Sequence, residues 1–341
     1  MISLLLVNYR SAALAADAIA TARVASSAPL QVVVVDNSCD AREAEALRGL
    51  ADTLVVSDTN RGYAGGINLG RRACAGQVLV VTNPDVVFDA GAMDRLVEAL
   101  DDAAVAGPAL FWDDAHRWML PPGDAYTGGQ RLDAVLASRS RAWFTERDRR
   151  RFRRRVAFWS LEHTKEVPML SGAVMAIRAE AFDDVDGFDE RFPLYFEETD
   201  FLRRVAERRG RIAYVPSARC RHLHNQSAAQ IAEEAAARYA ESELRYLEKW
   251  NGPFAAGLLK RLERRLPAYD AQRIDGLVLI DRDDVVVEAS PLPSFDTAAG
   301  CFAARGAIDV PVNAWTVPAI YLRTVVRRTG EVLATYVRYA S

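Results

Sequence analysis

Residues 2–9 are Ile-Ser-Leu-Leu-Leu-Val-Asn-Tyr, and residues 31–38 repeat the pattern as Gln-Val-Val-Val-Val-Asp-Asn-Ser. In each stretch a continuous apolar run, typical of a strand buried on both faces, ends in polar residues. Similar strands are predicted at 53–56 and at 78–82, the latter followed by Asn83-Pro84-Asp85. Helical segments separate these strands, so the sequence predicts a doubly wound, mainly parallel α/β sheet with helices on both faces.

The polar residues at the carboxyl ends of these strands are the first candidate site residues. Ligands of an open parallel sheet bind in the crevice outside the strand ends. Asp36 and Asp85 both occupy such positions. Asp85 is explained equally well as a helix cap or as a ligand of a divalent cation, and the segment alone leaves both interpretations open.

A glycine cluster at 60–70, Asn-Arg-Gly-Tyr-Ala-Gly-Gly-Ile-Asn-Leu-Gly, opens a predicted helix. Glycines let the backbone approach a ligand closely, and the free N–H groups of a helix start attract phosphate. The cluster matches neither the dinucleotide fingerprint nor the phosphate-binding loop. A plain strand-to-helix turn explains it as well.

A second cluster is acidic. Glu197, Glu198 and Asp200 stand at the start of an apolar-periodic run that predicts a helix. A helix N-terminus favours negative charge, so a capped, solvated first turn is the simple explanation. Further along lies His222. A lone histidine is more often structural, but paired with a strand-end carboxylate it would form a mixed oxygen and nitrogen site, which suits Mn²⁺ better than Mg²⁺.

Bulk properties set the class of protein. At 341 residues, half of them hydrophobic, the chain suits two domains or one large domain with an appendage. The net charge of −3 gives no general attraction to nucleic acid. Four scattered cysteines indicate reduced thiols in a cytoplasmic protein. No stretch approaches the roughly 18 apolar residues of a membrane span, and the N-terminal apolar run is interpreted as a strand and not as a signal peptide.

The middle and end of the chain differ from the start. The arginine-rich segment 141–155 predicts either a solvated helix face or a basic flap that contacts an anionic acceptor or the membrane surface. Long helices are predicted over 231–265, and β-like runs follow from 274 to 339. We therefore expect a domain at 1–266, with a nucleotide-binding half at 1–110 and an acceptor half at 111–266, and a separate small β-rich module at 267–341.

Taken in order, these segments resemble the inverting glycosyltransferases of family 2, which have the GT-A fold, and most closely their bacterial rhamnosyltransferase-like branch. The resemblance covers about residues 1–250. It is carried by Val7-Asn8-Tyr9, Val35-Asp36-Asn37-Ser38, the glycine cluster 60–70, Asn83-Pro84-Asp85, Ser171-Gly172-Ala173, the segment Gly187–Asp200, and His222 with Ser227.

The resemblance implies a role for each matched position. Glu198 inherits the catalytic base, with Glu197 and Asp200 as alternatives, because the family has Glu-Asp where this chain has Glu-Glu. Asp85 and His222 would hold Mn²⁺ or Mg²⁺, with Asn83 in the weaker first position of the metal motif. The donor nucleotide would be bound by Asn8, Tyr9, Asp36, Asn37, Asn60, Gly62, Gly65, Gly66, Asn68 and Asn83.

The implied activity is a metal-dependent transfer, with inversion, of a sugar such as rhamnose. The donor would be a dTDP-, UDP- or GDP-sugar, and the acceptor a hydroxyl of a saccharide or lipid-linked saccharide in surface polysaccharide assembly. We expect a cytoplasmic protein that binds no nucleic acid; contact with the inner membrane face and an oligomeric state stay open. Two alternatives remain: a non-catalytic sugar-nucleotide or polysaccharide-binding protein, and a pyrophosphorylase, although the latter needs a basic glycine-rich loop where this chain has Asn8-Tyr9-Arg10-Ser11-Ala12.

Overall fold

A computed structural model of the chain describes residues 1–123, 125–192, 194–223, 232–310 and 317–340. The chain divides into two compact units. The first comprises residues 1–109, 123–125 and 162–246, and the second comprises 110–122, 126–161 and 247–341. A cut at the predicted boundary between residues 266 and 267 would pass through the second unit, because that unit also takes up segments from the middle of the chain.

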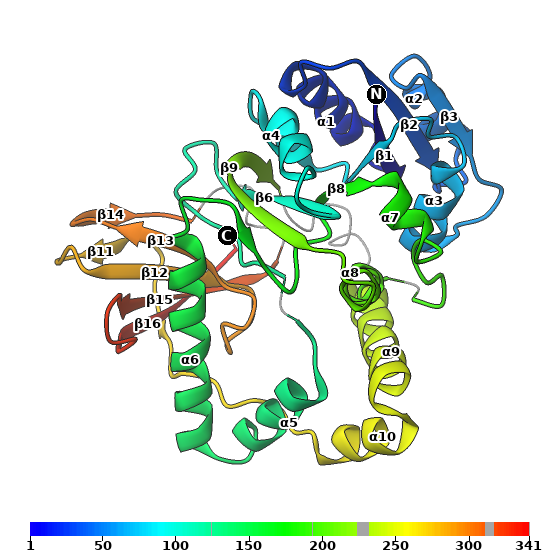
Figure 1. Cartoon of the computed structure of the whole chain (residues 1–341). Coiled ribbons are helices and arrows are strands. Elements are labelled where there is room, and N and C mark those ends of the chain that lie inside the picture. Colours follow the sequence, from blue (N-terminus) through cyan, green and yellow to red (C-terminus); the bar gives the residue numbers. More distant parts are fainter. Residues whose placement is uncertain (124, 193, 224–231, 311–316, 341) are drawn as a thin grey trace. The chain divides into compact units, whose positions relative to one another are not determined.

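The first unit is built on a sheet whose leading strands are parallel (Figure 1). β1 (Ile2–Asn8) lies between β2 (Leu30–Asp36) and β4 (Val78–Thr82), and β3 (Thr53–Val56) follows beyond β2. Every residue of β1 is buried. Burial on both faces accounts for the unbroken apolar runs, so the predicted doubly wound parallel arrangement is confirmed for this part of the sheet. The helices of the unit are α1 (Ala12–Ala25), α2 (Ala41–Leu47), α3 (Gly62–Arg71), α4 (Ala92–Ala99), α7 (Ala179–Asp183), α8 (Glu197–Glu207) and most of α9 (Ala232–Asn251).

The later strands of the same sheet are antiparallel. β8 (Val174–Arg178) pairs with β4 and with β6 (Val105–Phe111). β9 (Ile212–His222) pairs with β5 (Val86–Phe88) and with β7 (Lys165–Glu166). The register of β5 and β9 sets Val86 opposite His222, which brings the end of β9 to the segment that follows β4.

The second unit holds a separate β-structure. Its five-stranded sheet has the order β10-β16-β15-β12-β13, and β11 pairs with β14 apart from it. The strands are β10 (Gln272–Arg273), β11 (Val278–Ile280), β12 (Val285–Ser290), β13 (Ala299–Ala303), β14 (Gly306–Ile308), β15 (Ala319–Val326) and β16 (Val332–Tyr339), and the helices are α5 (Gly128–Ala137), α6 (Arg141–Trp159) and α10 (Pro253–Leu262). The sequence did not predict β13 or β14, whose small residues carry little strand signal. The predicted strand at 315–317 falls largely outside the described residues.

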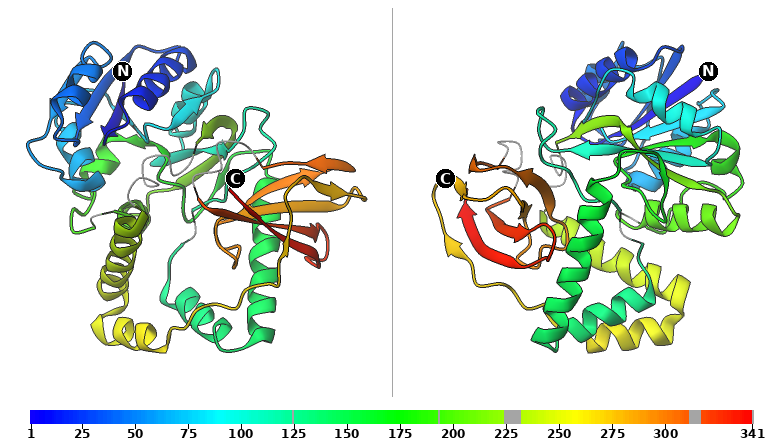
Figure 2. Two further views of the ribbon diagram at one scale, coloured as in Figure 1. Left: turned by 180° about the vertical axis from the view of Figure 1, so that it is seen from behind. Right: turned by 60° about the vertical axis from the view of Figure 1, so that its left-hand side comes forward.

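The arginine-rich segment forms α6, which packs on this sheet (Figure 2). Phe152 and Trp159 of α6 form an apolar cluster with Val286 of β12 and Val325 of β15. A Cβ atom at Gly300 of β13 would lie 2.2 Å from the indole of Trp159, so only glycine fits there. The predicted solvated helix face is present, since Arg149, Arg150, Arg153 and Arg154 are exposed. The other face of α6 is buried against the sheet, so the segment is not a flap.

Charged side chains of α6 are buried in the same contact. Arg151 donates two hydrogen bonds to Glu288 of β12, at 2.8 and 2.9 Å. Arg323 of β15 donates to Asp148 at 2.6 Å and to Glu288 at 2.6 Å. Tyr269 donates to Asp148 at 2.5 Å. Each buried charge thus has a partner of opposite sign, which is what allows an arginine-rich helix to enter a core.

None of the helices in the described parts of the chain is long and apolar enough to cross a membrane.

Candidate active site

The acidic cluster lies on the first turn of α8, after an unusual turn. Tyr195 and Phe196 both have φ of 67°, in the left-handed region that residues with side chains rarely adopt. Such conformations persist only where the surroundings hold them, and they concentrate at functional sites. The turn buries Glu197, which is 5% exposed, and leaves Glu198 half-buried.

Each of these glutamates has one oxygen without a partner. Oε2 of Glu197 and Oε2 of Glu198 are buried and accept no hydrogen bond from the described residues. Burial raises the pKa of Glu197 well above 4.5, and the charge of Glu198 raises it further. Burial also raises the pKa of Glu198, although backbone hydrogen bonds partly oppose the shift. Strongly raised carboxyl pKa values beside unpartnered oxygens are typical of acid–base sites.

Asp200, the third member of the cluster, lies in a different environment. Its Oδ2 accepts a hydrogen bond from Nε of Arg204 at 2.7 Å. Arg204 in turn donates to the carbonyl oxygens of Val185 and Gly187. Asp200 is fully buried and its carboxylate pairs with Arg204, which anchors α8 to the segment 185–187. Asp200 is therefore a weaker candidate for the base than either glutamate.

The Ser171-Gly172-Ala173 motif packs against Glu198. A Cβ atom at Gly172 would lie 3.0 Å from Cγ and 3.2 Å from Cβ of Glu198. The missing side chain therefore makes room for the glutamate, and a larger residue there would displace it.

Asp85 and His222 meet at the end of β9. Nε2 of His222 lies 3.2 Å from Oδ1 of Asp85, and the N–H of Leu223 donates to the carbonyl oxygen of Asp85 at 3.0 Å. Both side chains are buried, at 6% exposed for Asp85 and 8% for His222. A carboxylate oxygen and an imidazole nitrogen fit a divalent ion such as Mn²⁺. Within the described residues no group of three or more histidine, cysteine or acidic side chains could hold a metal.

Tyr63 of α3 is a further candidate site residue, which the sequence did not single out. Its hydroxyl is buried and has no partner among the described residues. Burial raises the pKa of the Tyr63 phenol, and the charges of Glu197, Glu198 and Asp85 raise it further. Tyr63 therefore lies within electrostatic range of both the acidic turn and the Asp85–His222 pair. The only signal for it in the sequence was an aromatic residue among glycines.

The strand-end residues Asn8 and Asp36 form a closed network. Nδ2 of Asn8 donates to Oδ1 of Asp36 at 3.0 Å. The backbone N–H and the hydroxyl of Ser38 donate to the same carboxylate at 3.1 and 2.9 Å. The network holds Asp36 as a buried, hydrogen-bonded carboxylate at the end of β2. Tyr9 is half-buried beside it in sequence, with the guanidinium of Arg10 over its ring at 5.5 Å.

Asn37 links this strand end to the glycine cluster. Its Nδ2 donates to the carbonyl oxygen of Gly62 at 2.8 Å, and its buried Oδ1 has no partner among the described residues. Oδ1 of Asn60 accepts from the N–H of Gly62 at 2.9 Å. The start of α3 is thus fixed next to the carboxyl end of β2, with one amide oxygen left to meet a ligand.

The other cluster residues pack against protein. A Cβ atom at Gly66 would lie 2.8 Å from Val7, and one at Gly65 would lie 2.9 Å from Arg61. Asn68 donates to the carbonyl oxygen of Phe188 at 2.8 Å and accepts from its N–H at 3.0 Å. In this structure these three residues make packing and hydrogen-bond contacts at α3. This agrees with the interpretation of the glycine cluster as a plain strand-to-helix turn.

Two further positions complete the set. The N–H of Asn83 donates to the carbonyl oxygen of Ala173 at 2.9 Å, which joins the segment after β4 to the Ser171-Gly172-Ala173 motif. Ser227 lies outside the described residues.

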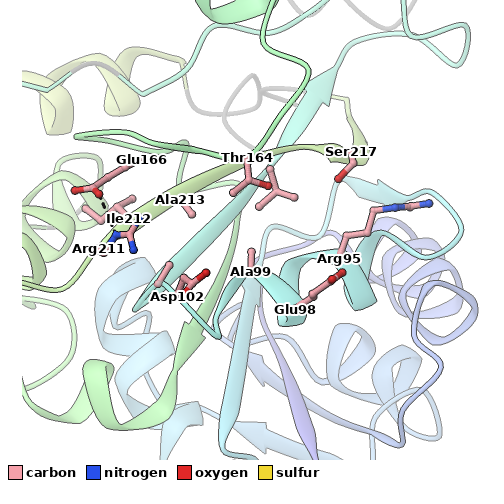
Figure 3. A pocket seen from close by; sticks show the side chains of 12 residues that line it. Arg95, Glu98, Ala99, Asp102, Thr164, Glu166, Arg211, Ile212, Ala213 and Ser217 are labelled. Carbon is pink, nitrogen blue, oxygen red and sulfur yellow. Dashed lines mark hydrogen bonds and ion pairs between the residues drawn. The ribbon is translucent and has the colours of Figure 1, made fainter.

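A cavity of about 390 Å³ in the first unit lies elsewhere (Figure 3). It is lined by residues of α4 and the loop after it, of the segment 164–166, and of β9 with Arg211 just before it. Arg95 and Glu98 of α4 are among them. Arg211 is paired with Glu166 at 3.0 Å. None of the residues predicted for the site lines it, so it is separate from the acidic turn and the Asp85–His222 pair.

Comparison with known families decides the class of this site. The model of the family described as "Glycosyltransferase like family 2" matches residues 2–231, which is more than half of the chain and includes the residues assembled above. The chain belongs to glycosyltransferase family 2. The expected GT-A type of α/β fold and a glycosyltransferase activity follow from this membership, and the pyrophosphorylase alternative falls away.

Individual relatives are more distant. The chain is 27% identical over 230 residues to the N-acetylglucosaminyl-diphospho-decaprenol L-rhamnosyltransferase of Mycobacterium tuberculosis, covering 60% of this chain and 70% of the relative. Among solved structures, the mannosyltransferase PcManGT from Pyrobaculum calidifontis, in complex with GDP-Man and Mn²⁺, is 16% identical with a TM-score of 0.48, covering 76% of this chain and 69% of that one. TarS residues 1–349 from S. aureus are 14% identical with a TM-score of 0.42, covering 70% of this chain and 64% of that one.

Proposed function

We propose that this glycosyltransferase moves a sugar, with inversion, from a nucleoside-diphosphate donor to a hydroxyl of a saccharide or lipid-linked saccharide. The observation that carries the proposal is the convergence on Tyr63 of two carboxylate groups. One is the Glu197–Glu198 turn with its unpartnered oxygens, and the other is Asp85 with His222. A base and an anion-neutralising site close together are the two parts that a single displacement needs.

Glu198 is the proposed base. Its carboxylate takes the proton from the acceptor hydroxyl as that oxygen bonds to the anomeric carbon, and the bond from this carbon to the donor diphosphate breaks with its electron pair going to the diphosphate. The raised pKa of Glu198 makes its carboxylate a stronger proton acceptor than a solvated glutamate. Glu197 remains the alternative, because its environment is similar.

Asp85 and His222 would hold the divalent ion. Such an ion supplies positive charge where the leaving diphosphate gains negative charge. Tyr63 is placed to donate its hydroxyl hydrogen bond to a substrate oxygen in the same space. The hydrogen-bonded Asp36 and the free Oδ1 of Asn37 are proposed to contact the nucleoside, with Asn8 positioning Asp36.

For the substrates we propose a rhamnosyl group and a polyprenyl-diphosphate saccharide, in surface polysaccharide assembly on the cytoplasmic side. The support is the 27% identical relative, whose name includes both chemistries. A non-catalytic role in binding sugar nucleotides is the competing proposal. It is supported by the Glu197-Glu198 pair, because this chain has Glu-Glu where the family has Glu-Asp.

The test is release of nucleoside diphosphate and formation of a glycosylated product from dTDP-rhamnose, with UDP- and GDP-sugars as comparisons, in the presence of Mn²⁺ and a polyprenyl-diphosphate N-acetylglucosamine acceptor. We expect product from wild type and from Glu180→Gln, which alters an exposed glutamate in the first turn of α7. We expect none above background from Glu198→Gln. Binding of a donor without any turnover of it would favour the non-catalytic role.

A further inference from the structure

The surface of α10 combines an exposed aromatic residue with a cluster of positive charges. Phe254 is 85% exposed and Leu258 is 47% exposed. Positions 254, 257, 258 and 261 share one helix face, so Gly257 and Arg261 lie beside these two side chains. Lys260, Arg264 and Arg265, which are also exposed, follow at the end of the helix. An apolar face edged with basic residues is the pattern of helices that lie on membranes.

The opposite side of α10 is attached to the second unit. Ala256 is fully buried. Arg131 of α5 forms an ion pair with Glu263, and Arg139 donates two hydrogen bonds to the carbonyl oxygen of Leu262, at 3.3 and 3.1 Å. Figure 2 shows α10 beside α5. One face of α10 is therefore fixed by contacts with the rest of the second unit, and Phe254 lies on the exposed face.

The size and charge of the surface around Phe254 and Leu258 indicate whether a protein or a lipid membrane binds there. Two side chains cannot supply the roughly 800 Å² that each partner buries in a stable protein interface. Insertion into a lipid headgroup layer needs only a few apolar side chains, together with basic residues that face anionic lipid. The other strongly exposed leucine pair of this unit, Leu277 and Leu279, has no excess of positive charge around it. The arginines nearby are each paired with an aspartate: Arg273 with Asp275, Arg282 with Asp284 and Arg305 with Asp283.

We propose that α10 is a membrane-docking element, in which Phe254 and Leu258 insert into the headgroup region of an anionic bilayer while Lys260, Arg261, Arg264 and Arg265 contact lipid phosphates. The docking does not depend on the transfer reaction. It would hold the enzyme at the surface where a lipid-linked acceptor is presented.

The test is sedimentation of the full-length protein with vesicles of phosphatidylcholine, with and without phosphatidylglycerol. Wild type should bind the anionic vesicles, and binding should fall in high salt. Each basic residue near the surface changes the partition coefficient by about fivefold, so replacing all four by glutamine should abolish binding. Phe254→Ser should weaken it at least tenfold, and the control Leu279→Ser should bind as wild type.

Gly257 offers a gain-of-function variant. A Cβ atom at this position would meet no other atom within 4 Å, so a larger side chain fits without displacing a neighbour. Gly257→Leu extends the apolar face between Phe254 and Leu258, and we expect it to bind anionic vesicles severalfold more tightly than wild type. This outcome cannot be attributed to misfolding.

Three results would overturn the proposal. Wild type failing to bind anionic vesicles is the first, and Phe254→Ser and Gly257→Leu both binding as wild type is the second. The third is a self-association of wild type in solution that Phe254→Ser removes, since the occupant of this face would then be a second copy of the chain. Transfer to a detergent-solubilised acceptor should be unchanged in Phe254→Ser, which separates failure of docking from failure of the proposed function.

Discussion

Nε2 of His222 lies 3.2 Å from Oδ1 of Asp85, although the two residues are far apart in the chain. The contact exists because β9 runs antiparallel to β5, with His222 opposite Val86 in the register. The pairing of two strands thus places an imidazole beside a strand-end carboxylate, the two kinds of side chain that we propose hold a divalent ion.

The first prediction is that Asp85→Ala removes the metal dependence of nucleotide binding. Wild type should bind a nucleoside diphosphate more tightly with Mn²⁺ than with EDTA, because an ion held by Asp85 and His222 would supply positive charge to the phosphates. The variant should bind equally weakly in both conditions, as measured by calorimetry. Asp89→Ala, on the other side of β5, is the control. Equal affinities for wild type with and without metal would contradict the assignment.

The second prediction concerns the base. Glu198→Gln keeps the shape of the side chain and removes its charge, so kcat should fall by about 10² to 10⁴ while donor affinity stays near the wild-type value. Glu197→Gln and Asp200→Asn are to be measured in parallel. If one of those is inactive while Glu198→Gln retains its rate, that neighbour is the base; if all three are active, the single-displacement mechanism is wrong.

The third prediction is a pH dependence of stability. The pKa of Glu197 is raised above its ordinary value of 4.5, so the folded state binds a proton more tightly than the unfolded state. Its contribution to stability is therefore fully present below pH 4.5 and is lost as pH rises through the raised pKa. Glu197→Gln, which cannot ionise, should unfold at a higher temperature than wild type at pH 8, and the difference should shrink toward pH 4.5. A difference that does not vary with pH would refute the burial argument.

The fourth prediction addresses the buried ion cluster of the second unit. Burial alone would raise the pKa of Asp148, but the charges and hydrogen bonds of Arg323, the charge of Arg151 and a hydrogen bond from Tyr269 lower it to about 2. Arg323→Met leaves two buried carboxylates short of positive charge, which should reduce the free energy of unfolding by about 3–5 kcal/mol. Arg282→Met, which breaks only the exposed pair with Asp284, should leave the free energy of unfolding close to the wild-type value, because solvent screens an exposed ion pair. Denaturant unfolding measures both.

The same cluster bears on where the chain can be divided. Truncation after residue 266 removes Glu288 and Arg323 and leaves Arg151 and Asp148 of α6 without them. We expect this truncated chain to be insoluble or to bind nucleotide poorly, which would place the boundary of the catalytic part elsewhere than at 266. A soluble truncated chain with wild-type nucleotide affinity would instead support the boundary that the sequence predicts.

The buried strands and the candidate residues at their ends could be predicted from local pattern, because a strand covered on both faces is apolar at nearly every position. Residues 2–8 and 30–36 follow this pattern apart from Ser3 and Gln31, and the polar residues that end them, Asn8 and Asp36, must then lie at one edge of the sheet. The acidic turn at 197–200 was recognisable as a helix start for similar reasons, since charge preference at a helix N-terminus is local.

Long-range packing decided the rest. Tyr63 becomes a site candidate only because α3 brings it near Glu197, Glu198 and Asp85, and no spacing in the chain encodes that approach. The charged residues of α6 resembled a solvated surface, but Arg151 and Asp148 are buried. The energy of a buried charge depends on its partner, and their partners, Glu288 and Arg323 respectively, come from strands far along the chain. By itself, then, the sequence determined the elements and their polar ends, through interactions between near neighbours. Which carboxylates are buried, paired or left with a free oxygen was decided by the tertiary structure, because desolvation and Coulomb energy depend on distances in space.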